Sequence, residues 1–339
     1  MIIRTSFAAV AVLAALAVAP ASAQPDYYQG KQARIFTMGS PGGGYDTYTR
    51  TVSAFLEKRT GARVVVNNEV AAGGMIAMNR MSNAAPDGLT LLLTGGEGLV
   101  TAQLYGLAGV HYDIRKQIFL ARVAGEDKVA VVGPKSPYKS VADMQQMADR
   151  PAIWAGSGKA DNNSDFSAIM CYALGVRCKI IVGYKGTGDM NMAITRAEVD
   201  GRVISDEAAA LDGESSGMRV VTVLARQRSE KFPNVPTIFE SKLSPTAERL
   251  LDWRAGIASL GRVILVTPGT PRERVDYLRA QLAEILQDPA FVAEVKKVNL
   301  AAGYLSAKDV EAAVERALTT LDAKGLAEIK DIALNRYYN

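Results

Sequence analysis

The chain has 339 residues, of which 39 are basic and 35 acidic, so its net charge is +4 at neutral pH. This weak excess of positive charge, with no basic cluster, argues against nucleic acid as a partner. One histidine and two cysteines supply too few ligands for a zinc site, so we expect no metal and no cofactor. The length is sufficient for two ordinary domains.

The first 23 residues have the composition of a secretory signal peptide. Arg4 precedes an apolar run over residues 7–19, and residues 20–23 form a small-x-small cleavage site. A membrane anchor is the alternative, but this run is shorter than the roughly 20 apolar residues that span a bilayer. We therefore expect cleavage after Ala23 and export to the periplasm. No later segment is long and apolar enough to span a membrane.

Apolar strands alternate with helical stretches along the mature chain, which predicts two α/β domains, each a mostly parallel sheet flanked by helices. The expected strands lie at 34–38, 64–66, 90–93, 129–132, 152–155, 179–182, 199–204, 219–224 and 263–266. Ser140, a capping box at Thr270–Glu273, and Ser306 are expected to begin helices. We place one domain at 24–124 plus 226–339, the other at 125–225, and a ligand cleft between them.

The loop after the first expected strand is rich in glycine. Its sequence is Gly39-Ser40-Pro41-Gly42-Gly43-Gly44-Tyr45-Asp46. Glycine lets the backbone approach a ligand closely, and the first turn of the following helix presents unpaired N–H groups at the positive end of its dipole. The pattern favours a carboxylate or phosphate site over a plain turn. It is not a Walker A loop, since no Gly-Lys-Ser/Thr follows, nor a clean dinucleotide motif, since Thr47 fills the sixth position.

A second loop of this kind links a strand to a helix in the other half of the chain. Its sequence is Gly156-Ser157-Gly158-Lys159-Ala160-Asp161-Asn162-Asn163-Ser164. Ser157 is a weak candidate for a hydrolase nucleophile, because the frame is not G-x-S-x-G and the one histidine is His111. It fits better as a hydroxyl donor to a bound anion. Because ligand sites of open α/β sheets lie at the carboxyl ends of strands, the two loops predict a shared cleft.

The two cysteines, Cys171 and Cys178, stand seven residues apart. Export places them in an oxidising compartment, so we expect a disulfide that closes a small loop past Gly175. Two buried thiols are the alternative, and the lack of a C-x-x-C spacing argues against a redox centre.

Short motifs follow one another in a fixed order between about Arg34 and Leu321. They are Pro41–Asp46 with Arg50, Val64–Asn68 with Ala72–Gly74, Ala85–Leu92, Gly183–Gly186, Leu224–Arg228, Val235–Thr237 and Pro268–Pro271. In this order they resemble the landmarks of the tripartite tricarboxylate transporter substrate-binding proteins, the Bug receptors, whose pattern opens with P-G-G-x-x-D…A-R. Each motif is weak by itself, but the ordered set is specific.

The resemblance implies a two-domain, Venus-flytrap-like receptor that binds a small carboxylate, works with the membrane permease subunits of a transporter, and is a monomer without catalytic activity. Both glycine loops would hold one carboxylate of the ligand, largely through backbone N–H groups. The loop at 95–97 and the strand end at Ser205 would contact the rest. The implied ligand-binding residues are Ser40, Gly42, Gly43, Gly44, Tyr45, Asp46, Gly96, Glu97, Gly156, Ser157, Gly158, Asn162, Tyr184 and Ser205.

Several residues depart from the family's pattern and leave the identity of the ligand open. Tyr45 stands where many relatives have a small polar residue, Asp165 where many have His, and Gly183 replaces Pro. Glu97 and Asp206-Glu207 add negative charge. Facing inward, they would disfavour a second carboxylate and favour an amine or hydroxyl on the ligand; otherwise they are ordinary solvated acids. Two other functions stay open: a receptor that signals to a membrane sensor, and an exported serine hydrolase.

Overall fold

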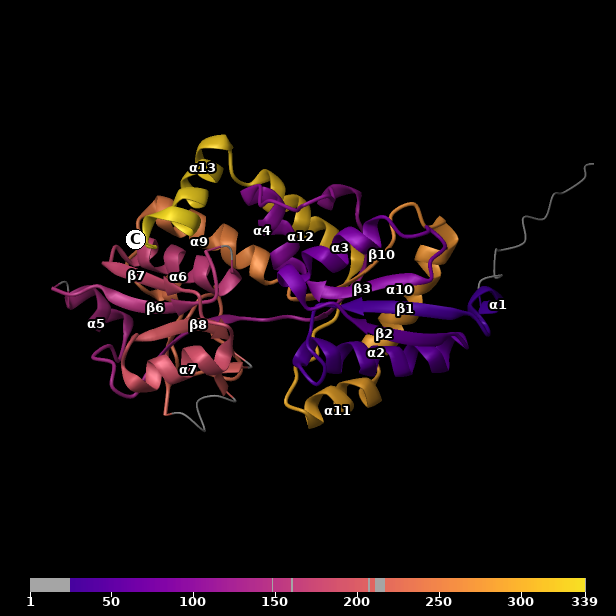
Figure 1. The fold of residues 1–339 in the computed structure, drawn as a ribbon, viewed down its shortest axis with the longest axis horizontal. Coiled ribbons are helices and arrows are strands. Elements are labelled where there is room, and N and C mark those ends of the chain that lie inside the picture. The colour runs from indigo at the N-terminus through magenta and orange to yellow at the C-terminus, as the bar shows by residue number, and fades with distance from the viewer. Residues whose placement is uncertain (1–24, 148, 160, 207, 211–216, 339) are drawn as a thin grey trace, which may run out of the picture.

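The computed structural model describes residues 25–147, 149–159, 161–206, 208–210 and 217–338. The chain forms two lobes that lie side by side, each built on one β-sheet (Figure 1). This confirms the predicted two-lobed α/β architecture. The expected signal peptide, residues 1–23, lies outside the described residues. Among the residues described, none of the helices is long and apolar enough to cross a bilayer.

The first sheet has six strands in the order β11-β4-β10-β3-β1-β2. Their bounds are β1 Gln32–Thr37, β2 Arg63–Asn68, β3 Thr90–Gly95, β4 Ile118–Ala124, β10 Arg262–Val266 and β11 Leu305–Ser306. Strand β1 pairs in parallel with β2 and β3, whereas β10 runs antiparallel to both of its neighbours, β3 and β4. The sheet is therefore mixed, and the parallel pairing that the sequence predicts is limited to β1, β2 and β3.

Helices cover both faces of the first sheet (Figure 1). Their bounds are α1 Pro25–Tyr28, α2 Gly44–Thr60, η1 Ala71–Gly74, α3 Met75–Ser82, α4 Gly96–Tyr105, η2 Ile114–Lys116, α10 Arg272–Gln287, α11 Pro289–Lys297 and α12 Ala307–Thr319. On one face α2 and α10 bury Leu56 and Leu282 against Ile35, and each such side chain contributes about 1.5–3 kcal/mol to folding. On the other face α3, α4 and α12 pack over Leu92 and Leu265.

The second sheet has five strands in the order β7-β6-β8-β5-β9. The elements of this lobe, with the segments that follow it, are β5 Lys128–Val132, α5 Val141–Gln146, β6 Ala152–Gly156, α6 Asn162–Leu174, β7 Cys178–Val182, α7 Thr187–Arg196, β8 Gly201–Ser205, β9 Arg219–Val223, η3 Ile238–Glu240, α9 Pro245–Ala258, α13 Ala323–Asp331 and η4 Ile332–Arg336. Strand β6 is parallel to β7 and β8, and β5 is antiparallel to β8 and β9. Helix α6 covers one face and α7 the other.

Helix α6 is buried on nearly all sides, which explains why its sequence lacks a polar face. It packs between the second sheet, α9 and the C-terminal η4. The buried apolar cluster around it is continuous with that of α4 in the first lobe. The predicted disulfide is confirmed: Cys171, near the end of α6, is bonded to Cys178 at the start of β7, with the left-handed Gly175 between them.

Three predicted helix starts have different outcomes. Ser140 and Ser306 each accept a hydrogen bond from the amide three residues on, so they cap α5 and α12 as predicted. The predicted capping box at Thr270 is wrong. The hydroxyl of Thr270 donates to the carbonyl of Thr267 instead (2.8 Å), because the turn before α10 uses it, and Pro271 is the residue at the N-cap.

The carboxyl ends of the parallel strands in the two sheets face each other. Strand β4 runs in the same direction as β1 and β3, so its end at Ala124 marks the edge where they also end. Only residues 125–127 separate Ala124 from Lys128, the start of β5. Lys128 pairs with Ser205, the end of β8, and β6 and β7 end at the same edge. The sequence prediction that both glycine loops lie toward the gap between the lobes therefore has a topological basis.

The strands divide between the lobes at the crossover over residues 125–127 and again after β9. The C-terminal helices do not follow this division, since α13 and η4 return to the second lobe and η4 packs against α6 (Figure 1). The assignment of all of 226–339 to the first domain remains a prediction.

Candidate functional site

Four helices begin at the facing strand ends without a side-chain cap. They are α2, α4, α6 and α7, which follow β1, β3, β6 and β7, and glycine is the N-cap of α2, α4 and α7. Helices α3 and α10 also lack a side-chain cap, at Gly74 and Pro271. By contrast, the side chains of Ser140, Ser244, Asp288, Ser306 and Asp322 cap α5, α9, α11, α12 and α13. First-turn N–H groups have no partner within a helix. Those of α2, α4, α6 and α7 are therefore free of side-chain caps and at the positive ends of the helix dipoles, although the Gly96 amide of α4 donates to the main-chain carbonyl of Gly261.

Asp46 folds the first glycine loop around its own carboxylate. It accepts hydrogen bonds from the Gly42 amide (2.8 Å), from Nε of Arg50 (2.9 Å) and from Nδ2 of Asn68 (2.8 Å). The hydrogen bond from Arg50, with those from Gly42 and Asn68, lowers the pKa of Asp46 to about 2. Gly42 has φ +78°, a conformation that favours glycine. Asp46 and Gly42 thus shape the loop, and the Asp46 carboxylate is already engaged within it.

Tyr45 lies between this loop and the amino end of α4. A Cβ at Gly95 would be 2.7 Å from the Tyr45 hydroxyl, so the hydroxyl rests against the backbone there. The guanidinium of Arg262 lies over the tyrosine ring, 5.3 Å from its centroid. Burial raises the pKa of Tyr45, so the hydroxyl stays protonated and available as a donor at neutral pH. Ser40, Gly43 and Gly44 complete the loop, and the Gly43 amide donates to the Ser40 carbonyl (2.9 Å).

The second glycine loop leaves β6 through a buried glycine. A Cβ at Gly156 would lie 2.0 Å from Oγ of Ser164, so only glycine fits. Ser157 is exposed, and its carbonyl accepts from the Gly183 amide (3.3 Å). The Gly158 carbonyl accepts from the Asp161 amide (3.1 Å), which turns the chain into α6.

Asn162, the first residue of α6, reaches across to the first lobe. Its Oδ1 accepts from Oγ1 of Thr101 on α4 (3.1 Å) and from Nη2 of Arg254 on α9 (3.3 Å). A Cβ at Gly98 would be 3.1 Å from its Nδ2. The structure therefore brings the second glycine loop against α4, and Asn162 connects the lobes.

Gly96 and Glu97 do not form the predicted loop; they are the first two residues of α4. The Gly96 amide donates to the Gly261 carbonyl (2.8 Å). Glu97 is 8% exposed and contacts Nζ of Lys128 (2.8 Å) and Nη1 of Arg254 (3.2 Å). The alternative of an ordinary solvated acid is wrong for Glu97, because its carboxylate is buried and two buried cations contact it. Its contact with the ligand stays a prediction.

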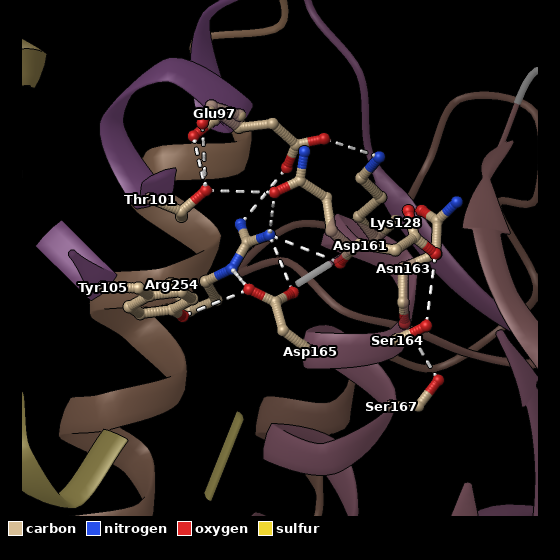
Figure 2. A network of polar contacts seen from close by, with 12 residues as sticks. Glu97, Thr101, Tyr105, Lys128, Asp161, Asn163, Ser164, Asp165, Ser167 and Arg254 are labelled. Atoms are coloured by element: carbon tan, nitrogen blue, oxygen red, sulfur yellow. Dashed lines mark hydrogen bonds and ion pairs between the residues drawn. The ribbon is translucent and has the colours of Figure 1, made fainter. Parts of the chain in front are cut away.

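Glu97 belongs to a buried set of charges that we call the interlobe ion network, shown in part in Figure 2. It consists of Glu97, Glu126, Lys128, Asp165, Arg254 and Arg262. Lys128 contacts Glu126 as well as Glu97, and Glu126 contacts Nη1 of Arg262 (3.4 Å). Burial alone would lower the pKa of Lys128, but Glu126 and Glu97 raise it above its usual value. Three cations therefore balance three carboxylates.

Arg254 is fully buried and lies at the centre of the network (Figure 2). Its Nε and Nη2 contact both oxygens of Asp165 (3.0 and 2.9 Å), the fork geometry that makes such pairs strong. The ring of Phe166 stacks against the guanidinium (4.1 Å), and the Tyr105 hydroxyl donates to Asp165 (3.1 Å). Because Arg254 belongs to α9, each of its contacts with α6 joins these two helices at the junction of the lobes.

Comparison with known proteins identifies the family. Residues 48–323 match the family model TctC, described as the tripartite tricarboxylate transporter family receptor. The chain belongs to this family. Its members are periplasmic solute-binding proteins.

The relatives and solved structures agree with this assignment. A UPF0065 protein of Bordetella bronchiseptica is 28% identical over 82% of this chain and 79% of its own. Protein BugT of Bordetella pertussis is 26% identical over 81% of each chain. The periplasmic binding protein BugD superposes with a TM-score of 0.70 at 20% identity, covering 91% of the receptor and 99% of BugD. The R. palustris protein Rpa4515, solved with adipate, has a TM-score of 0.70 at 20% identity, covering 88% and 97%.

Two remaining candidates lie on the second lobe of the receptor. Ser205 ends β8 directly opposite Lys128, and its Oγ accepts from the Ala208 amide (3.3 Å). Tyr184, in the loop between β7 and α7, is half-buried, and burial raises its pKa. The hollows between α9 and α12, beside α10 and beside α3 are lined by residues outside both glycine loops. A cavity shared by the two loops stays a prediction.

Sequence reasoning missed Arg254, although one signal was available. In α9 the buried positions Leu250, Leu251, Trp253 and Ile257 form an apolar face, and Arg254 falls on this face, three or four residues from three of these positions. A charged residue on the apolar face of a helix is rarely buried without a partner. The rest of the network could not be found in this way, because its partners come from four other segments of the chain.

Proposed function

We propose that this receptor captures a small organic carboxylate in the periplasm and delivers it to the membrane subunits of a tripartite tricarboxylate-type transporter, without catalysing a reaction. The observation that carries the proposal is the set of uncapped helix starts, α2, α4, α6 and α7, at the facing edges of the two sheets. Such starts bind anions. The solved proteins of this fold with adipate and with malate carry ligands of this chemistry.

In this proposal one carboxylate of the ligand accepts hydrogen bonds from N–H groups of both lobes. The amides of Gly44 and Tyr45 come from the first turn of α2, and the amides and hydroxyl around Ser157 come from the loop before α6. A ligand held from both sides stabilises the closed form relative to the open form, because it binds the closed form better. Cations are not required for this, and those of the interlobe ion network already have carboxylate partners.

The absence of a catalytic pair among the described residues supports binding over hydrolysis. Ser157 is the exposed serine of the second loop, and the amide of His111 bonds to Asn79 in the first lobe. No hydrogen bond joins Ser157 to His111 in the described part of the chain. A serine nucleophile needs such a base within hydrogen-bond reach.

A thermal-shift screen tests this function with mono-, di- and tricarboxylates, aromatic acids and amino acids, each paired with its uncharged amide. A ligand at about 100 times its Kd stabilises the receptor by roughly 2.7 kcal/mol. We expect at least one acid to raise the midpoint of unfolding and its amide to have no effect. Equal shifts for acid and amide, or no shift with any acid, would contradict the proposal. Recovery of the ligand with unchanged mass separates binding from hydrolysis.

A matched pair of variants locates the binding loop. Gly43→Val places a side chain at the N-cap of α2, where an added Cβ would lie 3.1 Å from the Ser40 carbonyl oxygen. The rest of the valine side chain would block access to the first-turn amides. Ser306→Val removes the side-chain cap of α12 and lies in neither glycine loop. We expect Gly43→Val to weaken binding at least tenfold and Ser306→Val to lower only stability. Normal binding by Gly43→Val would exclude this loop.

A further inference from the structure

A chain of contacts joins the two glycine loops through the interior of the protein. Each neighbouring pair along it is a hydrogen bond, an ion pair or a cation–π contact. The chain runs from Tyr45 to Arg262, Glu126, Lys128, Glu97, Arg254 and Asn162. Its first member lies in the first turn of α2 and its last is the first residue of α6. These are the helix starts to which the proposed function assigns the ligand.

Arg254 is the member that touches both lobes at helix starts. It contacts Glu97 in the first turn of α4, and it also contacts Asn162 through both Oδ1 and the main-chain carbonyl, each at 3.3 Å. The fork onto Asp165 one turn further along α6 fixes the plane of the guanidinium. A planar group held at this many points leaves little freedom for either helix start to move independently.

Stability alone does not account for this arrangement. Buried ion pairs gain little over apolar residues of similar volume, because desolvation offsets their attraction. The apolar cluster around α4, α6 and α9 already holds the lobes together at this junction. The fork of Arg254 adds a fixed direction of contact between the amino ends of α4 and α6.

We propose that Arg254 is a positioning residue, which sets the amino ends of α4 and α6 relative to each other and thereby determines the ligand affinity of the receptor. The inference rests on the proposed function for its affinity readout only. How rigidly the two helix starts are held is a property of the free protein, and it is measured without ligand.

The test compares Arg254→Lys and Arg254→Met with Arg226→Met. Arg226 is a matched control, since it also binds two carboxylates, Glu248 and Asp252 of α9, but it is half-exposed and contacts neither glycine loop. Arg254→Lys keeps the positive charge and loses the two-pronged contact with Asp165, so it still tests the inference if the Arg254→Met variant does not fold. Two quantities are measured on the full chain: amide hydrogen exchange of the free protein, and the Kd, by calorimetry, for the tightest acid of the thermal-shift screen.

We expect Arg254→Lys to stay folded, to exchange faster at 95–101 and 156–164 than the parent, and to bind the acid at least tenfold more weakly. Arg226→Met should match the parent in both measurements. A folded Arg254→Lys with parental exchange in these two segments would overturn the inference, whether or not a ligand is known. Faster exchange with an unchanged Kd would also overturn it, because the network would then be structural only. Failure of every acid to bind the parent would count against the proposed function alone.

Discussion

Asp46 illustrates how a residue predicted to contact the ligand serves the loop itself. Its pKa in the folded protein is about 2, below the ordinary value of 3.8. A lowered pKa in the folded state contributes stability that is present above about pH 4 and is lost as the pH falls toward 2. We expect Asp46→Asn to lower the free energy of unfolding by about 1–2 kcal/mol at pH 7.

Urea unfolding at a series of pH values checks this prediction. The difference between parent and Asp46→Asn should shrink between pH 4 and pH 2, because the parental carboxylate becomes protonated there. A constant difference over this range would show that the charge of Asp46 is not the cause.

Tyr45 permits a finer test at the same loop. Its ring packs under Arg262 and its hydroxyl rests against Gly95. We expect Tyr45→Ala to retain the fold and raise the Kd for the ligand about tenfold, since Tyr45 lies in the first turn of α2 and its hydroxyl reaches the start of α4. Tyr45→Phe keeps the ring and serves as the control for the hydroxyl. If calorimetry finds the same affinity for Tyr45→Ala as for the parent, Tyr45 has no part in the pocket.

At the residue level, glycine positions were predictable and charge pairings were not. Gly156 is required because a side chain there meets Ser164, and its place at a strand end indicates this use in the sequence. Glu97 looks the same in sequence as any exposed acid. Its burial depends on Lys128 and Arg254, which are 31 and 157 positions away along the chain, and no local pattern connects them.

The disulfide is the covalent connection between α6 and β7. Cys171 and Cys178 enclose a short loop, and closing a loop of about this size restricts the unfolded chain by roughly 2–3 kcal/mol. We expect the double variant Cys171→Ala/Cys178→Ala to lose about this much stability while its ligand affinity is unchanged. Calorimetric melting of the oxidised and reduced parent provides the control. A reduced parent as stable as the oxidised one would contradict the expectation.

Helices and strands whose sequence carries one clear hydrophobic pattern were predicted well. Those in which a charged residue or glycine interrupts the pattern were missed. Strands β1, β3 and β6 are short apolar runs bounded by glycine or polar residues, and they were found. Helix α4 begins Gly-Glu-Gly, which is typical of a loop. It starts directly after β3, where the Gly96 amide donates to the Gly261 carbonyl. Helix α9 was missed because Arg254 interrupts its apolar face.

At the level of the whole molecule, the interlobe ion network predicts strong coupling between distant residues. Arg254→Met leaves the buried Asp165 without its cation and Glu97 with Lys128 alone, and breaking a buried pair in this way typically costs about 3–5 kcal/mol. Adding Asp165→Asn removes this unpaired charge. We therefore expect the double variant to be less destabilised than the sum of its single variants, with a coupling of at least about 1 kcal/mol. Additive losses in urea unfolding would show that the pair is not coupled.

The two-lobed architecture followed from the rhythm of strands and helices, but its geometry did not. The facing of the strand ends depends on β4, which the sequence did not reveal because Arg122 interrupts its apolar run, and on the three residues that join it to β5. Periodicity also could not predict the return of α13 and η4 to the second lobe, since η4 packs on α6, a helix that is distant in sequence, and α13 packs on η4.

The way the chain enters and leaves the second lobe has an evolutionary consequence. The amide of Leu224 donates to the carbonyl of Lys128 (2.7 Å), so the incoming and outgoing backbones touch. The segment between them is joined covalently to the rest of the chain at this one place, while η4 and Arg254 contact it from outside. Recombination between receptors of this family could therefore exchange this segment at one junction, provided that the donor segment also supplies a carboxylate for Arg254 and a surface for η4.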